Sequence, residues 1–278
     1  MHGGPKSCAP AVEGQCDGDG RGVGAETLLS DLIWGHLDPT EQKNAACALD
    51  ELWTYCNTHV DQLATAPPPL VEQAGTRPGT NVLRALLDYH AKGSRHPELT
   101  RVEVASMAVD LLISNAELTP RLIANTLHHL LATNAYTTLL PEPHTVAMAV
   151  QETLRYDPPL TGWLRVTTRD TRIADTRLPA GARLLLLLGS AARDERHPTI
   201  DPDTYNPTRT DAPPLLAFGV GIHYCPGAPL ALHLARQTLT NLLHTCPHLA
   251  LSLPEAGAPA YWPTNTALRS PEHLTVTW

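Results

Sequence analysis

The sequence has few lysines and no long apolar run, and each absence excludes a class of protein. Only three of its 278 residues are lysine and the formal net charge is −8, which argues against a nucleic-acid-binding surface. The longest aliphatic run, Leu184 to Leu188, is far shorter than the ~20 residues that a membrane-spanning helix needs. We therefore expect no nucleic-acid partner and no membrane segment.

The cysteines and histidines lack the spacing of a disulfide framework or a metal site. None of the cysteines belongs to a CxxC pair, and their spacing is irregular: Cys8, Cys16, Cys47, Cys56, Cys225 and Cys246. This usage predicts free thiols in a reducing compartment. The N-terminus lacks the charged and then apolar stretches of a secretory signal, so the expected location is the cytoplasm. His128 and His129 show no metal-ligand spacing and are expected on a helix face or at the surface.

The composition predicts a globular domain preceded by a tail. Apolar residues make up 42% of the chain and charged residues 17%, which is typical of a folded protein. Residues 1–24 are rich in glycine and polar residues without periodicity, and they are predicted to form a flexible tail. We expect residues 25–278 to form a single domain.

Helical patterns dominate the chain up to residue 156. Residues 38–41 and 100–103 each have the sequence of a capping box, which predicts that helices begin there. Pro120 lies in the long apolar helix that follows and predicts a kink or an opening near Ala116. A further helix is expected over residues 145–156, and short strands over residues 163–167, 171–173, 183–188, 249–253 and 273–278. The predicted fold class is mainly α with a small β region.

Residues 217–231, Ala-Phe-Gly-Val-Gly-Ile-His-Tyr-Cys-Pro-Gly-Ala-Pro-Leu-Ala, form the most informative segment. Its glycines allow backbone conformations that a Cβ atom would forbid. The helical pattern that follows would direct its first N–H groups and positive dipole end toward the sulfur of Cys225, which favours the thiolate, a ligand of iron. A buried structural cysteine beside a glycine-rich turn is the alternative.

This segment resembles the haem-binding loop of the cytochrome P450 family, F-G-x-G-x-H-x-C-x-G. Every fixed position of the pattern is filled, by Phe218, Gly219, Gly221, His223, Cys225 and Gly227. The resemblance implies a haem b cofactor with Cys225 as the axial thiolate ligand and His223 at a haem propionate. Arg165 lies where relatives place a second propionate-binding residue. An arginine suits this role because cationic donors form charge-assisted bonds with carboxylates.

Glu152 and Arg155 carry a second element of the resemblance. An acid and a base three residues apart on a helix alone indicate an ordinary ion pair, worth about 0.3–0.5 kcal/mol. The spacing also matches the E-x-x-R of the family, which implies a structural lock on the irregular segment 197–214 beneath the haem. Many relatives contribute an arginine to this lock where Thr204 stands here, so Arg209 is the candidate third member.

The oxygen-activating motif of the family, A-G-x-[DE]-T, is matched only in part. Glu117 keeps the acid, Leu118 stands at the usual threonine position, and Thr119 is one residue further, about 100° round the helix. Oxygen activation needs protons delivered to the distal oxygen, so Glu117 and Thr119 are the candidate catalytic residues. The alternative is that they cap the helical segment that follows.

The resemblance covers roughly residues 40–278, the C-terminal portion of the family fold. We therefore expect a truncated, N-terminally short haem domain with an exposed apolar patch. A homodimer or a partner enzyme would then complete the substrate pocket.

The resemblance implies a monooxygenase-type haem-thiolate oxidoreductase that acts on a small organic secondary metabolite. It also implies a ferredoxin or flavoprotein as electron donor. One alternative is a haem-poor auxiliary or scaffold subunit of a partner enzyme. Another is haem chemistry without a distal threonine, such as rearrangement, cyclisation or peroxide use.

Overall fold

The computed structural model describes seven stretches of the chain, which fall into two compact units. The described residues are 38–66, 82–88, 99–139, 143–197, 200–252, 267–271 and 273–278. The units comprise residues 1–110 and 111–278, and each is treated separately below. The predicted tail over residues 1–24 lies outside the described residues. None of the described helices is long and apolar enough to cross a membrane.

The first unit contains helices α2 (Pro39–Thr65) and α3 (Val82–Leu87) and the first turns of α4 (Arg101–Ala132). Both predicted helix starts are confirmed. The Asp38 carboxylate accepts bonds from the backbone of the first turn of α2, and the Thr100 hydroxyl accepts one from the Glu103 N–H at 3.2 Å. Because these caps satisfy N–H groups that have no partner within the helix, local sequence suffices to place the helix starts.

Among the described residues of the first unit, one buried apolar cluster consists of Val60, Val104 and Ala105, with partly buried apolar side chains of α2 and α3 packed around it. The expectation of free thiols is confirmed for Cys56 and wrong for Cys47, which is disulfide-bonded. Spacing along the chain does not reveal which cysteines folding brings together.

Helix α4 runs without interruption past Pro120, so the opening near Ala116, one of the two predicted alternatives, is wrong, and the other, a kink, stays a prediction. Proline removes one backbone donor, which leaves the carbonyl four residues earlier without its usual partner. Ala116 is exposed, so solvent can satisfy that carbonyl. The long apolar pattern on both sides of the proline therefore maintains one helix.

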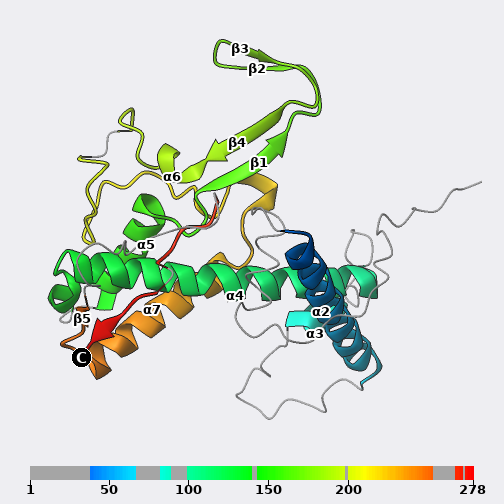
Figure 1. Cartoon of the computed structure of the whole chain (residues 1–278), viewed down its shortest axis with the longest axis horizontal. Coiled ribbons are helices and arrows are strands. Elements are labelled where there is room, and N and C mark those ends of the chain that lie inside the picture. Colours follow the sequence, from blue (N-terminus) through cyan, green and yellow to red (C-terminus); the bar gives the residue numbers. More distant parts are fainter. Residues whose placement is uncertain are drawn as a thin grey trace, which may run out of the picture. The chain divides into compact units, whose positions relative to one another are not determined.

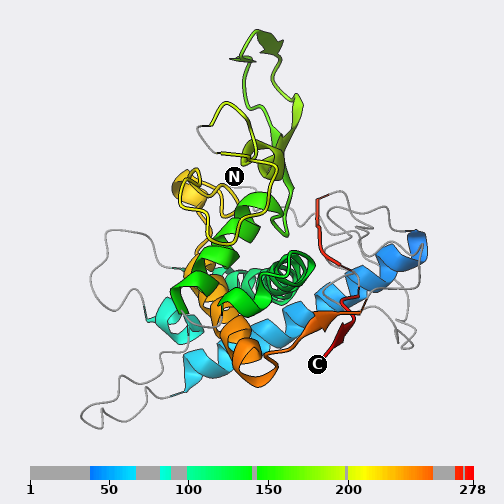
Figure 2. The ribbon, with the colours of Figure 1, turned by 90° about the vertical axis from the view of Figure 1, so that its left-hand side faces the viewer.

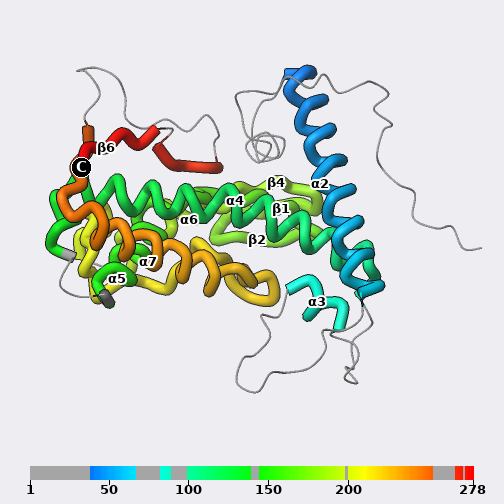
Figure 3. Tube along the Cα trace, turned by 90° about the horizontal axis from the view of Figure 1, so that it is seen from below, coloured from blue at the N-terminus to red at the C-terminus, as the bar shows by residue number. Residues whose placement is uncertain are grey.

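The second unit is built around three helices: the later turns of α4, α5 (Pro143–Tyr156) and α7 (Ala228–Thr245). Figures 1 and 3 show α7 lying alongside α4, and Figure 2 looks nearly along the axis of α4. The core joins apolar side chains of all three helices, among them Leu122, Leu130, Val146, Val150, Leu239 and Leu243. The short helices η1 (Tyr136–Leu139), α6 (Leu188–Ala191) and η2 (Gly221–His223) connect the longer elements.

The described strands of the second unit form three separate antiparallel pairs. Strand β1 (Gly162–Val166) pairs with β4 (Arg183–Leu187), and β2 (Thr171–Ile173) pairs with β3 (Thr176–Leu178). Strand β5 (Ala250–Leu251) pairs with β6 (Val276–Thr277). The small β region is therefore confirmed, and Figure 1 shows β1 to β4 extending away from α5 as one ribbon.

The ribbon of β1 and β4 exposes apolar side chains on both of its faces. The exposed residues are Trp163, Leu164, Val166, Leu185, Leu186 and Leu187. Contiguous apolar surface of this kind is typical of a site that another polypeptide segment covers.

Candidate functional site

The loop before α7 folds back on itself through backbone hydrogen bonds. The N–H of Cys225 donates to the carbonyl of Phe218 at 2.9 Å, and the N–H of Gly219 donates to Leu216 at 2.8 Å. Gly219 and Gly221 have φ angles of 72° and 81°, in the left-handed region that favours glycine. The two glycines therefore allow the tight path that places Cys225 next to the start of a helix.

Cys225 lies directly before the first turn of α7. Its carbonyl accepts a bond from the N–H of Ala228 at 3.3 Å, and the helix has no side-chain cap. The thiol is free and half-buried. A Cβ atom on Gly227 would meet the Cys225 sulfur at 3.7 Å, an ordinary contact, so packing within the chain does not require glycine there.

The two basic residues predicted to bind propionates are both exposed. Arg165 lies on β1, where its guanidinium donates to the carbonyl of Leu164 at 2.9 Å and lies 5.6 Å from the centre of the Trp163 ring. His223 ends η2. Neither forms an ion pair with a carboxylate in the stretches that the structure describes, so both can bind an anion.

The residues around Cys225 fit a haem. Haem presents an apolar ring, an iron that a thiolate can ligate and two carboxylates. Val220, Ile222 and Tyr224 are exposed apolar side chains in the same loop, with Ile222 97% exposed. The free thiol, the exposed apolar side chains and His223 lie in one loop and supply a complementary set of partners.

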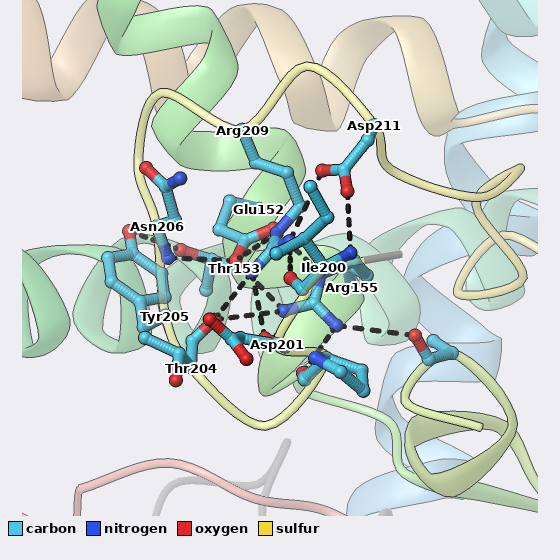
Figure 4. Close-up of polar contacts among 12 residues, drawn as sticks. Glu152, Thr153, Arg155, Ile200, Asp201, Thr204, Tyr205, Asn206, Arg209 and Asp211 are labelled. Carbon is cyan, nitrogen blue, oxygen red and sulfur yellow. Dashed lines mark hydrogen bonds and ion pairs between the residues drawn. The ribbon is translucent and has the colours of Figure 1, made fainter. Parts of the chain in front are cut away.

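Glu152, Arg155 and Arg209 meet in a buried cluster (Figure 4). The guanidinium of Arg155 forms a two-pronged bond with Glu152, at 2.7 and 2.9 Å. The Nε atom of Arg209 donates to the same carboxylate at 3.1 Å. The three residues predicted to form the lock are therefore in direct contact.

The two arginines of this cluster also bind the irregular segment between α6 and the cysteine loop. Arg155 donates to the carbonyl of Pro202 at 2.8 Å, and both arginines donate to the carbonyl of Thr204. A segment without helix or strand has few backbone partners of its own, and here guanidinium groups supply them. The cluster thus fixes the path of the chain that leads to Cys225.

The neighbours of Arg209 in the cluster favour its charged form. Burial opposes the charge of Arg209, but bonds with Glu152 and Asp211 raise its pKa above the usual range. A hydrogen bond from the Ile200 N–H lowers the pKa of Asp211. Burial raises the pKa of the Tyr205 hydroxyl, which bonds with Thr153 inside the cluster at 3.2 Å.

The two candidate catalytic residues of α4 are both buried, but they lie on different faces of the helix. Residues two positions apart on a helix point about 200° away from each other. Glu117 forms an ion pair with Arg121, whose Nε lies 2.6 Å from the carboxylate. The Thr119 hydroxyl donates to the side chain of Asn115 at 3.0 Å. The structure therefore does not bring Glu117 and Thr119 together.

A second buried polar cluster connects α4 with two later segments, and the sequence did not predict it. His129 lies 2.9 Å from one oxygen of Asp157, and the Nε of Arg269 lies 2.6 Å from the other. The amide of Asn125 donates to the carbonyls of Asp157 and Arg269 at 2.9 and 3.0 Å. His129 is on a helix face, as expected, but it is largely buried and stacks on Tyr205 at 4.8 Å. These residues are too far apart in the chain for a sequence motif to have predicted the cluster.

Comparison with known proteins identifies the family of the chain. The family model for cytochrome P450 matches residues 104–259. Nocardicin C N-oxygenase of Nocardia uniformis subsp. tsuyamanensis is 34% identical over 212 residues, which cover 75% of this chain and 51% of the relative. The cytochrome P450 monooxygenase PikC of Streptomyces venezuelae is 33% identical over 266 residues, which cover 91% of this chain and 60% of the relative.

Solved structures give the same family. The structure of cytochrome P450 CREJ in complex with (4-ethylphenyl) dihydrogen phosphate has a TM-score of 0.76 and 31% identity. The match covers 91% of this chain and 60% of that one. The chain thus spans about half to 60% of the length of these relatives.

Proposed function

The chain belongs to the cytochrome P450 family, and from that premise we propose that it is a haem-thiolate monooxygenase. The observation that carries the proposal is the geometry of the cysteine loop. Cys225 is a free, half-buried thiol held by the bond to Phe218 at the uncapped start of α7. A helix start favours an anion, so this position supports a thiolate ligand for iron.

The residues around the site would each have a separate task. A bound haem supplies a thiolate-ligated iron, which activates oxygen. Arg165 and His223 would orient the haem by binding its propionates. Glu152, Arg155 and Arg209 would keep the segment before Cys225 in place, because their hydrogen bonds fix its carbonyls.

We propose a small organic secondary metabolite as substrate and a ferredoxin or flavoprotein as electron donor. The relatives named nocardicin C N-oxygenase and monooxygenase PikC support an oxygen-inserting reaction. The exposed ribbon of β1 and β4 supports a homodimer or a partner enzyme that completes the pocket.

A cytoplasmic location is also part of the proposal. The free thiols of Cys56, Cys225 and Cys246 support a reducing compartment, whereas the disulfide at Cys47 opposes it.

The absorption spectrum of the reduced protein with carbon monoxide tests the proposal. We expect the Soret band of a thiolate-ligated haem in the native chain and its loss in Cys225→Ala. Cys246→Ala is the matched control, because Cys246 is also free and half-buried, and its variant should retain the band. Absence of haem uptake by the native chain contradicts the proposal.

A second candidate function is haem chemistry driven by peroxide. Leu118 occupies the usual threonine position, the Thr119 hydroxyl is bonded to Asn115, and Glu117 is paired with Arg121. These contacts favour a reaction that does not need proton delivery through a distal threonine. Product formed with hydrogen peroxide but not with a ferredoxin and its reductase supports this alternative. If product instead forms only with a ferredoxin and its reductase, Leu118→Thr should leave the fraction of reductant that ends in product unchanged or higher.

A further inference from the structure

The ion pair of Glu117 is part of a chain of contacts that leaves α4. Arg121 lies one helical turn after Glu117 and binds its carboxylate, through Nε at 2.6 Å and through a second close contact from Nη2. The remaining arm of the guanidinium donates to the hydroxyl of Ser270 at 2.6 Å. Glu117 and Ser270 are 7% and 5% exposed, so the two ends of this chain of contacts are buried.

Ser270 follows a segment that is itself held by two backbone hydrogen bonds. The N–H of Arg269 donates to the carbonyl of Pro159 at 2.9 Å, and the N–H of Thr161 donates to Ala267 at 2.7 Å. The backbone position of Ser270 is therefore determined by the turn between α5 and β1. A guanidinium is planar, with its donors in a fixed fork, so a bond at one end restricts the direction of the other.

We propose that Arg121 is a positioning residue that sets the direction of the Glu117 carboxylate by tying it to Ser270. The inference rests on the proposed function and on the candidate role of Glu117 as the acid that delivers protons on the distal side of the haem. While Arg121 is in place, the carboxylate faces the segment 267–271, on a different helix face from Thr119. Among the described residues, Arg121 is the cation that binds Glu117. Without Arg121, the Glu117 side chain becomes free to take another rotamer.

The stretching frequency of carbon monoxide on the reduced haem protein reports the charge near the distal ligand. Arg121→Met keeps the apolar stem of the side chain and removes the fork, so we expect a shifted band. Arg121→Lys keeps a charge that can reach Glu117 and should return the band toward its native position. Compared with Glu117→Gln alone, the double variant Arg121→Met with Glu117→Gln should show no further shift, because the charge that moves is absent from both.

Arg269→Met is the control for the loss of an arginine in the same region. Arg269 binds Asp157 and has no bond with Glu117, so its variant should leave the carbon monoxide band in place. Ser270→Ala keeps the ion pair and removes only the far bond, so it should produce a smaller shift than Arg121→Met. It also serves as the test if Arg121→Met does not fold.

The failure of this inference can be distinguished from the failure of the proposed function. If the native chain takes up no haem, the proposed function fails. Hydrogen exchange at the Arg269 amide then tests the contact alone, and exchange should rise in Arg121→Met and in Ser270→Ala. If haem is bound and every folded variant has the native carbon monoxide band, or the double variant is shifted relative to Glu117→Gln alone, Arg121 does not position Glu117.

Discussion

Two carboxylate–guanidinium pairs on helices of the second unit have the same chemistry and different surroundings. Glu152 and Arg155 are three residues apart, and their side chains are 1% and 0% exposed. Glu117 and Arg121 are four residues apart, and their side chains are 8% and 25% exposed. The first pair also forms hydrogen bonds with residues of the segment before Cys225. The second pair also forms a hydrogen bond with Ser270.

The difference shows that partners, and not the pair itself, determine the role. Glu152 accepts from two guanidinium groups and from the N–H of Asn206 at 2.9 Å, so its orientation is set by several elements at once. A buried charge with all its partners in place is rigid, and one that loses a partner is costly. The Glu117 pair has fewer partners and some contact with solvent. Its side chains can therefore change orientation more easily than those of the Glu152 pair, and we call it an adjustable contact.

Glu152→Gln should give the largest effect, because it removes the one charge that both buried arginines contact. Loss of a partner from a buried ion pair costs about 3–5 kcal/mol. We expect that loss in the free energy of unfolding, measured by urea denaturation of the native chain and the variant. A decrease comparable to that of an exposed ion pair would mean that the cluster does not fix the segment before Cys225.

Asp157→Asn should rank second, because it removes the charge that His129 and Arg269 share. The backbone bond from Asn125 to residue 157 remains, and an asparagine side chain can retain one weaker bond. Hydrogen bonds to charged groups contribute about 1.5–3 kcal/mol, so we expect a loss of about 2 kcal/mol in urea denaturation. His129→Gln is the matched variant from the other end of the contact and should cost less, since Arg269 keeps its carboxylate.

Glu117→Gln should have a smaller effect on stability, which makes it the direct counterpart of Glu152→Gln. Arg121 keeps contact with solvent and its bond with Ser270, so we expect a loss of about 1 kcal/mol. The same urea measurements provide the comparison. Equal losses in the two glutamine variants would remove the distinction between a lock and an adjustable contact.

Arg172→Gln should have no measurable effect on unfolding. Arg172 forms an ion pair with Asp175 at the tip of the ribbon, and the two side chains are 66% and 104% exposed. Exposed pairs of this kind contribute little, because solvent screens the charges. A clear loss of stability in this variant would indicate that the ribbon of β1 to β4 contributes more to folding than its exposure suggests.

Local sequence predicted the elements whose causes are local. Asp38 and Thr100 begin helices because their own side chains cap the first turn. Gly219 and Gly221 stand where the backbone has a positive φ, in the region that favours glycine. The segment around Cys225 was found in this way, and the family comparison agrees with it.

The sequence alone therefore determined the helix starts, the mainly α fold class and the loop that carries Cys225. The tertiary structure decided which groups meet: Arg209 with Glu152, His129 with Asp157, and Arg121 with Ser270. It also decided that α4 continues through Pro120. Caps and turns depend on atoms within a few residues of one another. The partners of these buried charged groups lie on segments that only folding brings together.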